Sequence, residues 1–218
     1  MMETDMNATI SLYDGIIVIP APQDRLGAYY SDFPYSLYDQ ASVLQDCSVT
    51  ISDIYSVATM YPGIVWNAAP NLYAIVPELN ELLGAIGPCL SLTAEAEPSW
   101  AALSALLQRC CEVPEVAVST ATKVLHKKRP GLIPIIDSVV EGKYKEASAA
   151  ADVAWPVGEG TQAVLVMQMM REDLLSGILP QIDALRLWVW TTRGIALTRV
   201  RVLEVLIWIM YEPKATFL

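Results

Sequence analysis

Residues 123–140 contain several side chains in this sequence that could take part in chemistry. The carboxylate of Asp137 is the first of these, because an aspartate can stabilise positive charge that develops as a glycosidic bond breaks. An aspartate is equally suited to cap a helix, since its side chain accepts backbone N–H bonds at a helix start. Asp137 is therefore a candidate catalytic residue, with helix capping as the simpler alternative.

Basic side chains are concentrated in the same stretch and continue onto the helix expected after it. Such a cluster can bind a phosphate or another anion. The alternative is a solvated helix end, where cations interact favourably with the helix dipole. Arg129 is also a candidate to pair with a carboxylate from the acidic half of the chain. The lone histidine has no second His or Cys at ligand spacing, so we expect no metal and no cofactor. The candidate binding residues are Lys123, His126, Lys127, Lys128, Arg129 and Lys143.

A turn between two helices must position these side chains. The residue before Pro130 is disfavoured in a helix, so the first helix is expected to begin at Pro114 and to end at Arg129. A second proline stiffens the short apolar turn that follows. Asp137 is then expected at the N-cap of a helix that runs to about Tyr144. This arrangement aims one carboxylate at the head of the second helix.

The rest of the chain predicts an all-α fold, a single-domain bundle of about eight helices. Thr50 and Asp53 have the spacing of a capping box, and Ser99 is placed to cap an amphipathic helix. Glycine or proline residues mark the ends of the later helical patterns. Three further helices are expected at residues 161–176, 180–193 and 198–211.

The N-terminal part is the least helical. The β-branched run at residues 16–19, bounded by glycine and proline, predicts one short strand or a hairpin. Residues 20–39 are rich in turn formers and are expected to be a surface connection with one short helix. These patterns divide the chain into an N-terminal extension at residues 1–24 and a single helical domain at residues 25–218.

The net charge of −10 is unevenly distributed over the 218 residues. Up to residue 108 there is one basic residue, Arg25, against twelve acidic ones, whereas the remainder is nearly balanced. An acidic surface repels nucleic-acid phosphates, so nucleic acid is a possible but disfavoured partner.

Cysteine usage and hydropathy indicate a cytoplasmic protein. Cys47, Cys89, Cys110 and Cys111 include no pair at the spacing of a zinc or redox site, so we interpret them as free thiols in a reducing compartment. The longest uncharged run, residues 54–77, contains prolines and a glycine that would break a spanning helix, so no membrane association is expected.

The last two expected helices are apolar on several faces, which is typical of helices that are also buried by a partner. This pattern predicts a homodimer through the C-terminal helices. The residues concerned are Leu185, Leu187, Trp188, Trp190, Ile207 and Trp208.

Residues 113–121 and 136–140 resemble, in register, the hairpin and the Val-Asp-Thr-His-Val segment of the helix-hairpin-helix DNA glycosylase superfamily. Residues 123–140 are more closely similar to the signature of a family of uncharacterised bacterial helical proteins, with weaker likeness over residues 25–212. The resemblance implies a glycosylase-like helical fold with a degenerate hairpin, but it implies no reaction.

The chain departs from the glycosylase pattern at the residues that matter for DNA chemistry. Glu115 and Ala117 replace the two hairpin glycines, and Ser119 replaces the lysine of bifunctional members. Lys123 lies about one turn later, and only Asp137 is retained. A non-enzymatic binding or interaction protein is therefore the leading hypothesis. The alternatives are a base-excision-type DNA-processing enzyme that uses Asp137 and a small-molecule binder in the vestigial base pocket.

Overall fold

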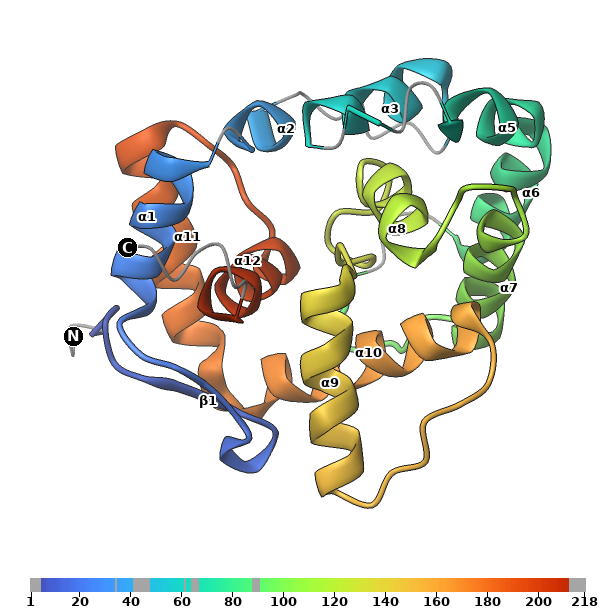
Figure 1. Ribbon diagram of the computed structural model, residues 1–218. Helices are drawn as coiled ribbons and strands as arrows, with labels where there is room; N and C mark the ends of the chain where they lie inside the picture. The colour runs from blue at the N-terminus through green and yellow to red at the C-terminus, as the bar shows by residue number, and fades with distance from the viewer. Residues whose placement is uncertain are drawn as a thin grey trace.

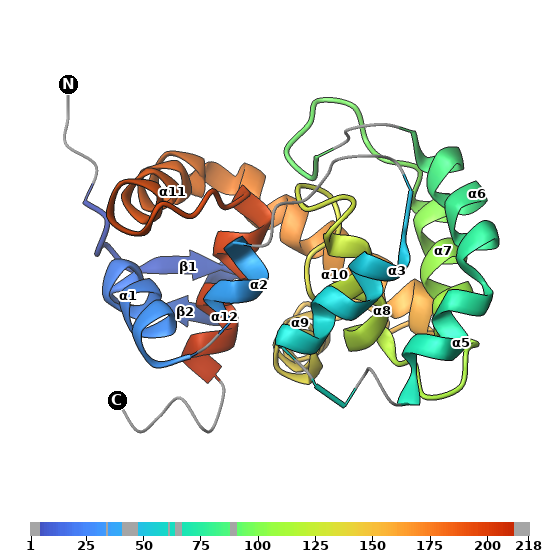
Figure 2. The same cartoon turned by 90° about the horizontal axis from the view of Figure 1, so that it is seen from above.

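The chain is mostly helical and carries one two-stranded antiparallel sheet within the residues that the structure describes. Figures 1 and 2 show that the hairpin and the first and last helices lie together on one side, while the middle of the chain forms a second group of helices. Within the described part of the chain, no helix is long and apolar enough to cross a bilayer. This computed structural model describes residues 5–33, 35–40, 48–60, 62–63, 67–87 and 91–211.

A β-hairpin opens the fold, as the β-branched run predicts. Strand β1 (Ile10–Leu12) pairs with β2 (Ile17–Ile19) so that Ile10 lies opposite Ile19. The first and third residues of each strand are buried, because alternate side chains of a strand point to the same face. Strand β2 contacts the last helix, so the hairpin belongs to the hydrophobic core.

Two helices occupy the stretch that we expected to be a surface connection, and this expectation is wrong. Helix α1 (Pro22–Asp32) begins with a proline, which is tolerated in a first helical turn because its missing N–H would have no partner there. Helix α2 (Ser36–Gln40) follows. Leu26, Tyr29 and Tyr38 are buried, so this turn-rich segment supplies large side chains to the core.

The second group of helices begins with α3 (Ile51–Ser56), which continues as a 3-10 turn, η2 (Val57–Thr59). The predicted capping box is confirmed, with Thr50 at the N-cap and Asp53 accepting from the Thr50 N–H at 2.7 Å. Two helices that each carry a proline in the first turn come next. They are α5 (Ala69–Ala74) and α6 (Val76–Ile86).

Helix α7 (Trp100–Cys111) begins where the sequence predicts it, because the Ala102 N–H donates to Ser99 Oγ at 3.4 Å. Its apolar face packs against α6 and α10. Cys110 is buried and Cys111 is half-buried, and both are free thiols. Cys47 and Cys89 lie outside the described residues.

The central turn joins α8 (Val118–His126) to α9 (Ser138–Ala150). Helix α8 begins later than the predicted start at Pro114, because Glu115 adopts a left-handed backbone with φ of 66° and holds the preceding residues in a turn. Helix α9 extends beyond the predicted end near Tyr144.

The bounds of the final helices lie close to those predicted from the glycine and proline positions. Helix α10 (Glu159–Asp173) runs into a short π-helical segment, η3 (Leu174–Ile178), where Gly177 has a φ of 108°. Helix α11 (Leu179–Arg193) ends at Gly194 in the left-handed conformation. Helix α12 (Arg199–Tyr211) is the last, and it packs against α1, α11 and α9.

Candidate functional site

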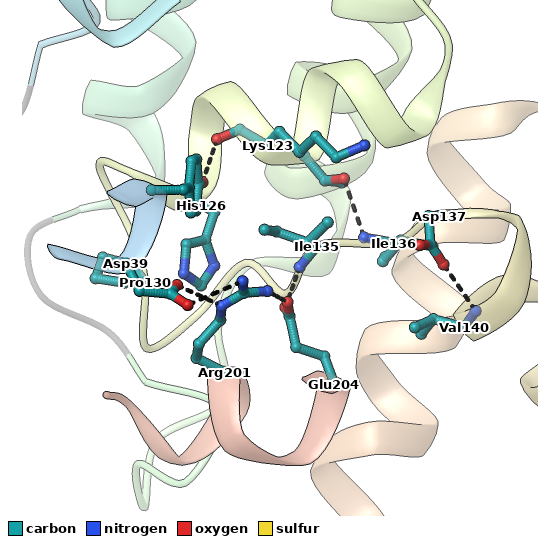
Figure 3. Close-up of polar contacts among 12 residues, drawn as sticks. Asp39, Lys123, His126, Pro130, Ile135, Ile136, Asp137, Val140, Arg201 and Glu204 are labelled. Atoms are coloured by element: carbon teal, nitrogen blue, oxygen red, sulfur yellow. Dashed lines mark hydrogen bonds and ion pairs between the residues drawn. The ribbon is translucent and has the colours of Figure 1, made fainter. Parts of the chain in front are cut away.

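Asp137 caps α9, as the sequence predicts. Its Oδ1 accepts the backbone N–H groups of Val139 and Val140, both at 3.0 Å, while its own backbone is extended. Figure 3 shows this carboxylate at the head of α9, at the end of the turn that carries Ile135 and Ile136. The cap therefore fixes the position of one carboxylate beside the turn.

A cavity of about 70 Å³ lies beside Asp137. At the density of liquid water this volume holds about two water molecules, and the cavity is open toward solvent, so a larger planar ligand would extend out of it. Two kinds of side chain line the cavity: aromatic or aliphatic ones, and charged ones. The apolar lining residues are Tyr29, Tyr35, Met60, Ile135, Val140, Val205 and Trp208, and the charged ones are Lys123, Asp137, Arg201 and Glu204.

Lys123 reaches this cavity from α8, on the other side of the turn from Asp137. Its ammonium donates to Ser119 Oγ at 2.7 Å. Burial lowers the pKa of Lys123, while the charges of Asp137 and Glu204 act in the opposite direction. The structure thus brings together two candidate residues that lie fourteen positions apart in the sequence.

A buried ionic network, drawn in Figure 3, borders the cavity through Arg201 and Glu204. The Arg201 guanidinium donates to Asp39 Oδ1 at 2.7 Å and to the Tyr29 hydroxyl at 2.8 Å, and it also forms an ion pair with Glu204. These charged side chains are almost completely inaccessible to solvent. Buried charges require partners of this kind, because the loss of hydration is otherwise uncompensated.

Glu204 connects this network to the central turn. Its second carboxylate oxygen accepts the backbone N–H of Ile135, and the next N–H, of Ile136, donates to Thr122 Oγ1 at 3.0 Å. Burial raises the pKa of Glu204 to about 8, although Arg201 opposes the shift. Two polar side chains from different helices therefore satisfy the turn's backbone and hold it in place.

The run from His126 to Arg129 is buried, which corrects the interpretation of these residues as a solvated helix end. Each of the four residues is only 4–5% exposed. The His126 Nδ1–H donates to the Ile133 carbonyl at 2.7 Å. Burial, reinforced by the charge of Arg201, lowers the pKa of His126 to about 3, so the ring is neutral. Physically, the turn folds the run inward against α2 and α3.

A clamp between the basic run and the acidic half exists, but Lys128 makes it with Asp53. The Lys128 Nζ lies 2.8 Å from Asp53 Oδ2. Arg129, which we expected in this role, instead donates to the carbonyl oxygens of Lys128 and Gly87. The same aspartate closes the capping box of α3, so one carboxylate joins α3 to the end of α8.

Lys143 is not among the residues that line the cavity. Its ammonium pairs with Glu146 at 2.6 Å and lies 4.4 Å from the centre of the Tyr211 ring. The buried network also contains three residues that the sequence did not predict at the site, Asp39, Arg201 and Glu204. A signal for the last two exists, because, after Arg199 at its start, Arg201 and Glu204 are the only charged residues of α12. Such a pair on a buried face is typical of an internal ion pair.

The fold and the site together define a mostly helical protein with a small polar cavity at a capped helix start. The chain belongs to a family of unknown function, DUF6308, whose model matches residues 22–211. The comparisons with curated proteins and with solved structures found no match.

Proposed function

We propose that this protein is a binding protein for a small, planar, polar molecule, held in the cavity beside Asp137. The observation that carries the proposal is the position of Lys123 and Asp137 on one cavity that Tyr35 and Trp208 also line. A cavity with aromatic walls and a few convergent polar groups is typical of small-molecule sites. This role develops the small-molecule alternative that the sequence left open.

The charged residues that line the cavity indicate which hydrogen-bonding groups a ligand must carry. The ammonium of Lys123 is a hydrogen-bond donor, and the carboxylate of Asp137 is an acceptor. Glu204 and Arg201 are occupied by each other and by the turn. A ligand that carries a carbonyl next to an N–H, such as a cyclic amide, offers the complementary pair. Aromatic neighbours favour a flat ring in this position, because aromatic faces stack at offset geometry.

A degenerate glycosylase-like scaffold remains part of this proposal. The left-handed backbone at Glu115 supports it, because this is the position at which the compared hairpin has a glycine. Base-excision chemistry through Asp137 is the second candidate, and the proximity of Lys123 favours it. Burial of the basic run weighs against it, since buried cations are poor contacts for DNA phosphates.

The test is calorimetric titration with uracil, 2-pyridone and benzamide as probes. We expect at least one of these amides to bind, with affinity lowered about tenfold by Lys123→Met and by Asp137→Asn. Asparagine keeps one oxygen to cap α9 and replaces the other by an uncharged NH2 group, so the helix cap is preserved. Lys143→Met is the matched control, because this lysine lies outside the cavity.

Failure of all three amides at millimolar concentration would exclude the proposal, as would an equal loss in the Lys143→Met control. Binding of duplex DNA that weakens steeply with salt, together with its loss in Asp137→Asn, would favour the enzymatic alternative.

A further inference from the structure

A second and larger cavity shares Arg201 with the first, so one side chain of the buried network borders both. The larger one is a cleft of about 700 Å³, formed by the end of α2, the end of α8 and the loop between α11 and α12. Its volume falls within the range of about 300–1,000 Å³ that is usual for ligand sites. Arg201 and Asp39 line this cleft, and they already form hydrogen bonds with each other.

Lys127 contributes a buried cation to this cleft. Its ammonium lies 3.6 Å from the centre of the Tyr38 ring and donates to the Tyr38 carbonyl oxygen. Among the described residues no carboxylate lies within ion-pair distance of it. Burial lowers the pKa of Lys127 to about 8, against the opposing charge of Asp39. A bound anion would stabilise the charged form of this lysine.

Arg193 contributes a second cation, from the exposed end of α11. Its guanidinium donates to Ser31 Oγ at 3.1 Å, and no carboxylate within the described ranges forms an ion pair with it. Asp39 also borders the cleft, but both of its carboxylate oxygens are engaged by Arg201. The cleft therefore presents two cations whose charges are not offset by a contacting carboxylate.

Trp190 adds an aromatic surface beside these cations. Its side chain is 55% exposed, which is unusual for so large an apolar group, and it lines the same cleft. Trp190 and Arg193 are three residues apart on α11, so they lie on the same face of the helix. An exposed ring next to cations is the arrangement that binds a base together with its phosphate.

We propose that this cleft binds a nucleoside phosphate, with the phosphate between Lys127 and Arg193 and the base against Trp190. A phosphomonoester carries a charge of about −2 near neutral pH, which matches two cations. A ligand with a single carboxylate would balance only one of them. The ring and the anion are recognised by different residues, so neither part alone is sufficient for full affinity. This site is distinct from the cavity beside Asp137.

The experiment is calorimetric titration of the full chain with AMP, adenosine and inorganic phosphate. We expect AMP to bind at least about tenfold more tightly than either fragment. Trp190→Ala and Arg193→Gln should each weaken AMP binding about tenfold, and both residues are exposed, so these variants fold. Lys127→Gln should abolish binding, with circular dichroism as the check on its folding.

Matched controls separate the site from general effects. Arg25→Gln makes the same charge change on α1, and Tyr73→Ala removes an exposed aromatic ring on α5, and both should leave AMP binding unchanged. Lys123→Met should also leave it unchanged, so a failure here is distinguishable from a failure of the amide-binding proposal. Absence of AMP binding at millimolar concentration would overturn the inference, as would phosphate binding as tight as that of AMP.

Discussion

At the scale of single residues, the pair of Arg201 and Glu204 has the widest structural influence. Removing two charges from water costs free energy that only close pairing and further hydrogen bonds can offset. Asp39, Tyr29 and the Ile135 N–H supply these bonds. The pair thereby holds α12 against both the central turn and α2. Arg201 lines both cavities, so one member of the pair is shared by the two proposed sites.

Asp173 is a second buried residue, and its carboxyl group is expected to make the stability of the fold depend on pH. Its carboxylate accepts the Tyr13 N–H at 2.8 Å and the Tyr144 hydroxyl at 2.9 Å, which ties the hairpin to α9 and α10. Burial raises the pKa of Asp173 from 3.8 to about 6. Because the folded-state pKa is raised, the stability from protonation is fully present below pH 3.8 and is lost as the pH rises through 6.

We predict that Asp173→Asn removes this pH dependence, since an amide keeps an acceptor but does not titrate. A shift of about two pKa units corresponds to roughly 3 kcal/mol between pH 4 and pH 8. Urea unfolding at both pH values measures the difference between wild type and variant. Glu172 and Asp14 also raise this pKa and remain in both proteins. Parallel pH profiles for the two proteins would contradict the prediction.

At the scale of elements, the contact of α10 with α7 depends on a glycine. A Cβ built on Gly160 would lie 2.5 Å from the Ser104 carbonyl oxygen and 2.8 Å from the Gln108 backbone nitrogen. Backbone atoms cannot move aside as a flexible side chain does, so the two helices must separate to admit a methyl group. The small residue therefore sets how closely α10 approaches its neighbour.

Gly160→Ala should accordingly lower the free energy of unfolding by about 2 kcal/mol, the usual cost of overpacking. Gly142→Ala is the control, because nothing lies within 4 Å of a Cβ at that position in α9. Alanine should raise stability there by about 0.5–1 kcal/mol, owing to its higher helix propensity. Chemical denaturation measures both, and equal effects of the two substitutions would refute the packing argument.

At the scale of the whole molecule, the apolar C-terminal helices serve mainly the chain's own core. Leu185 and Ile207 are fully buried, and Trp188 and Trp208 are partly buried against the core. Leu187 and Trp190 are the members of the predicted dimer surface that stay exposed, at 62% and 55%. Any homodimer through α11 must therefore use a smaller surface than the sequence pattern implied.

The homodimer stays a prediction, now centred on Leu187. We expect light scattering at tens of micromolar to give twice the mass of the chain, and Leu187→Glu to give the monomer, because a carboxylate cannot be buried there without a partner. Leu37→Glu, at a 60% exposed position on α2, is the matched control. A monomer in the wild type at this concentration would remove the hypothesis.

Local interactions made the helix caps and one helix end predictable. The caps at Thr50, Ser99 and Asp137 and the helix end at Gly194 involve residues within a few positions of each other, so their spacing is visible in the sequence. The start of α8 was misplaced, because a left-handed Glu115 is a strained local choice that no propensity predicts. The hairpin partner of β2 was likewise hidden in a run of only three residues.

The sequence by itself determined the helical class, the caps and the carboxylate at the head of α9, because these depend on backbone groups a few residues apart. Only the tertiary structure decided that the basic run turns inward, that Lys123 and Asp137 meet on one cavity, and that Asp39 on α2 pairs with Arg201 on α12. Those contacts join residues far apart in the chain, and burial of apolar surface across the whole core selects among them.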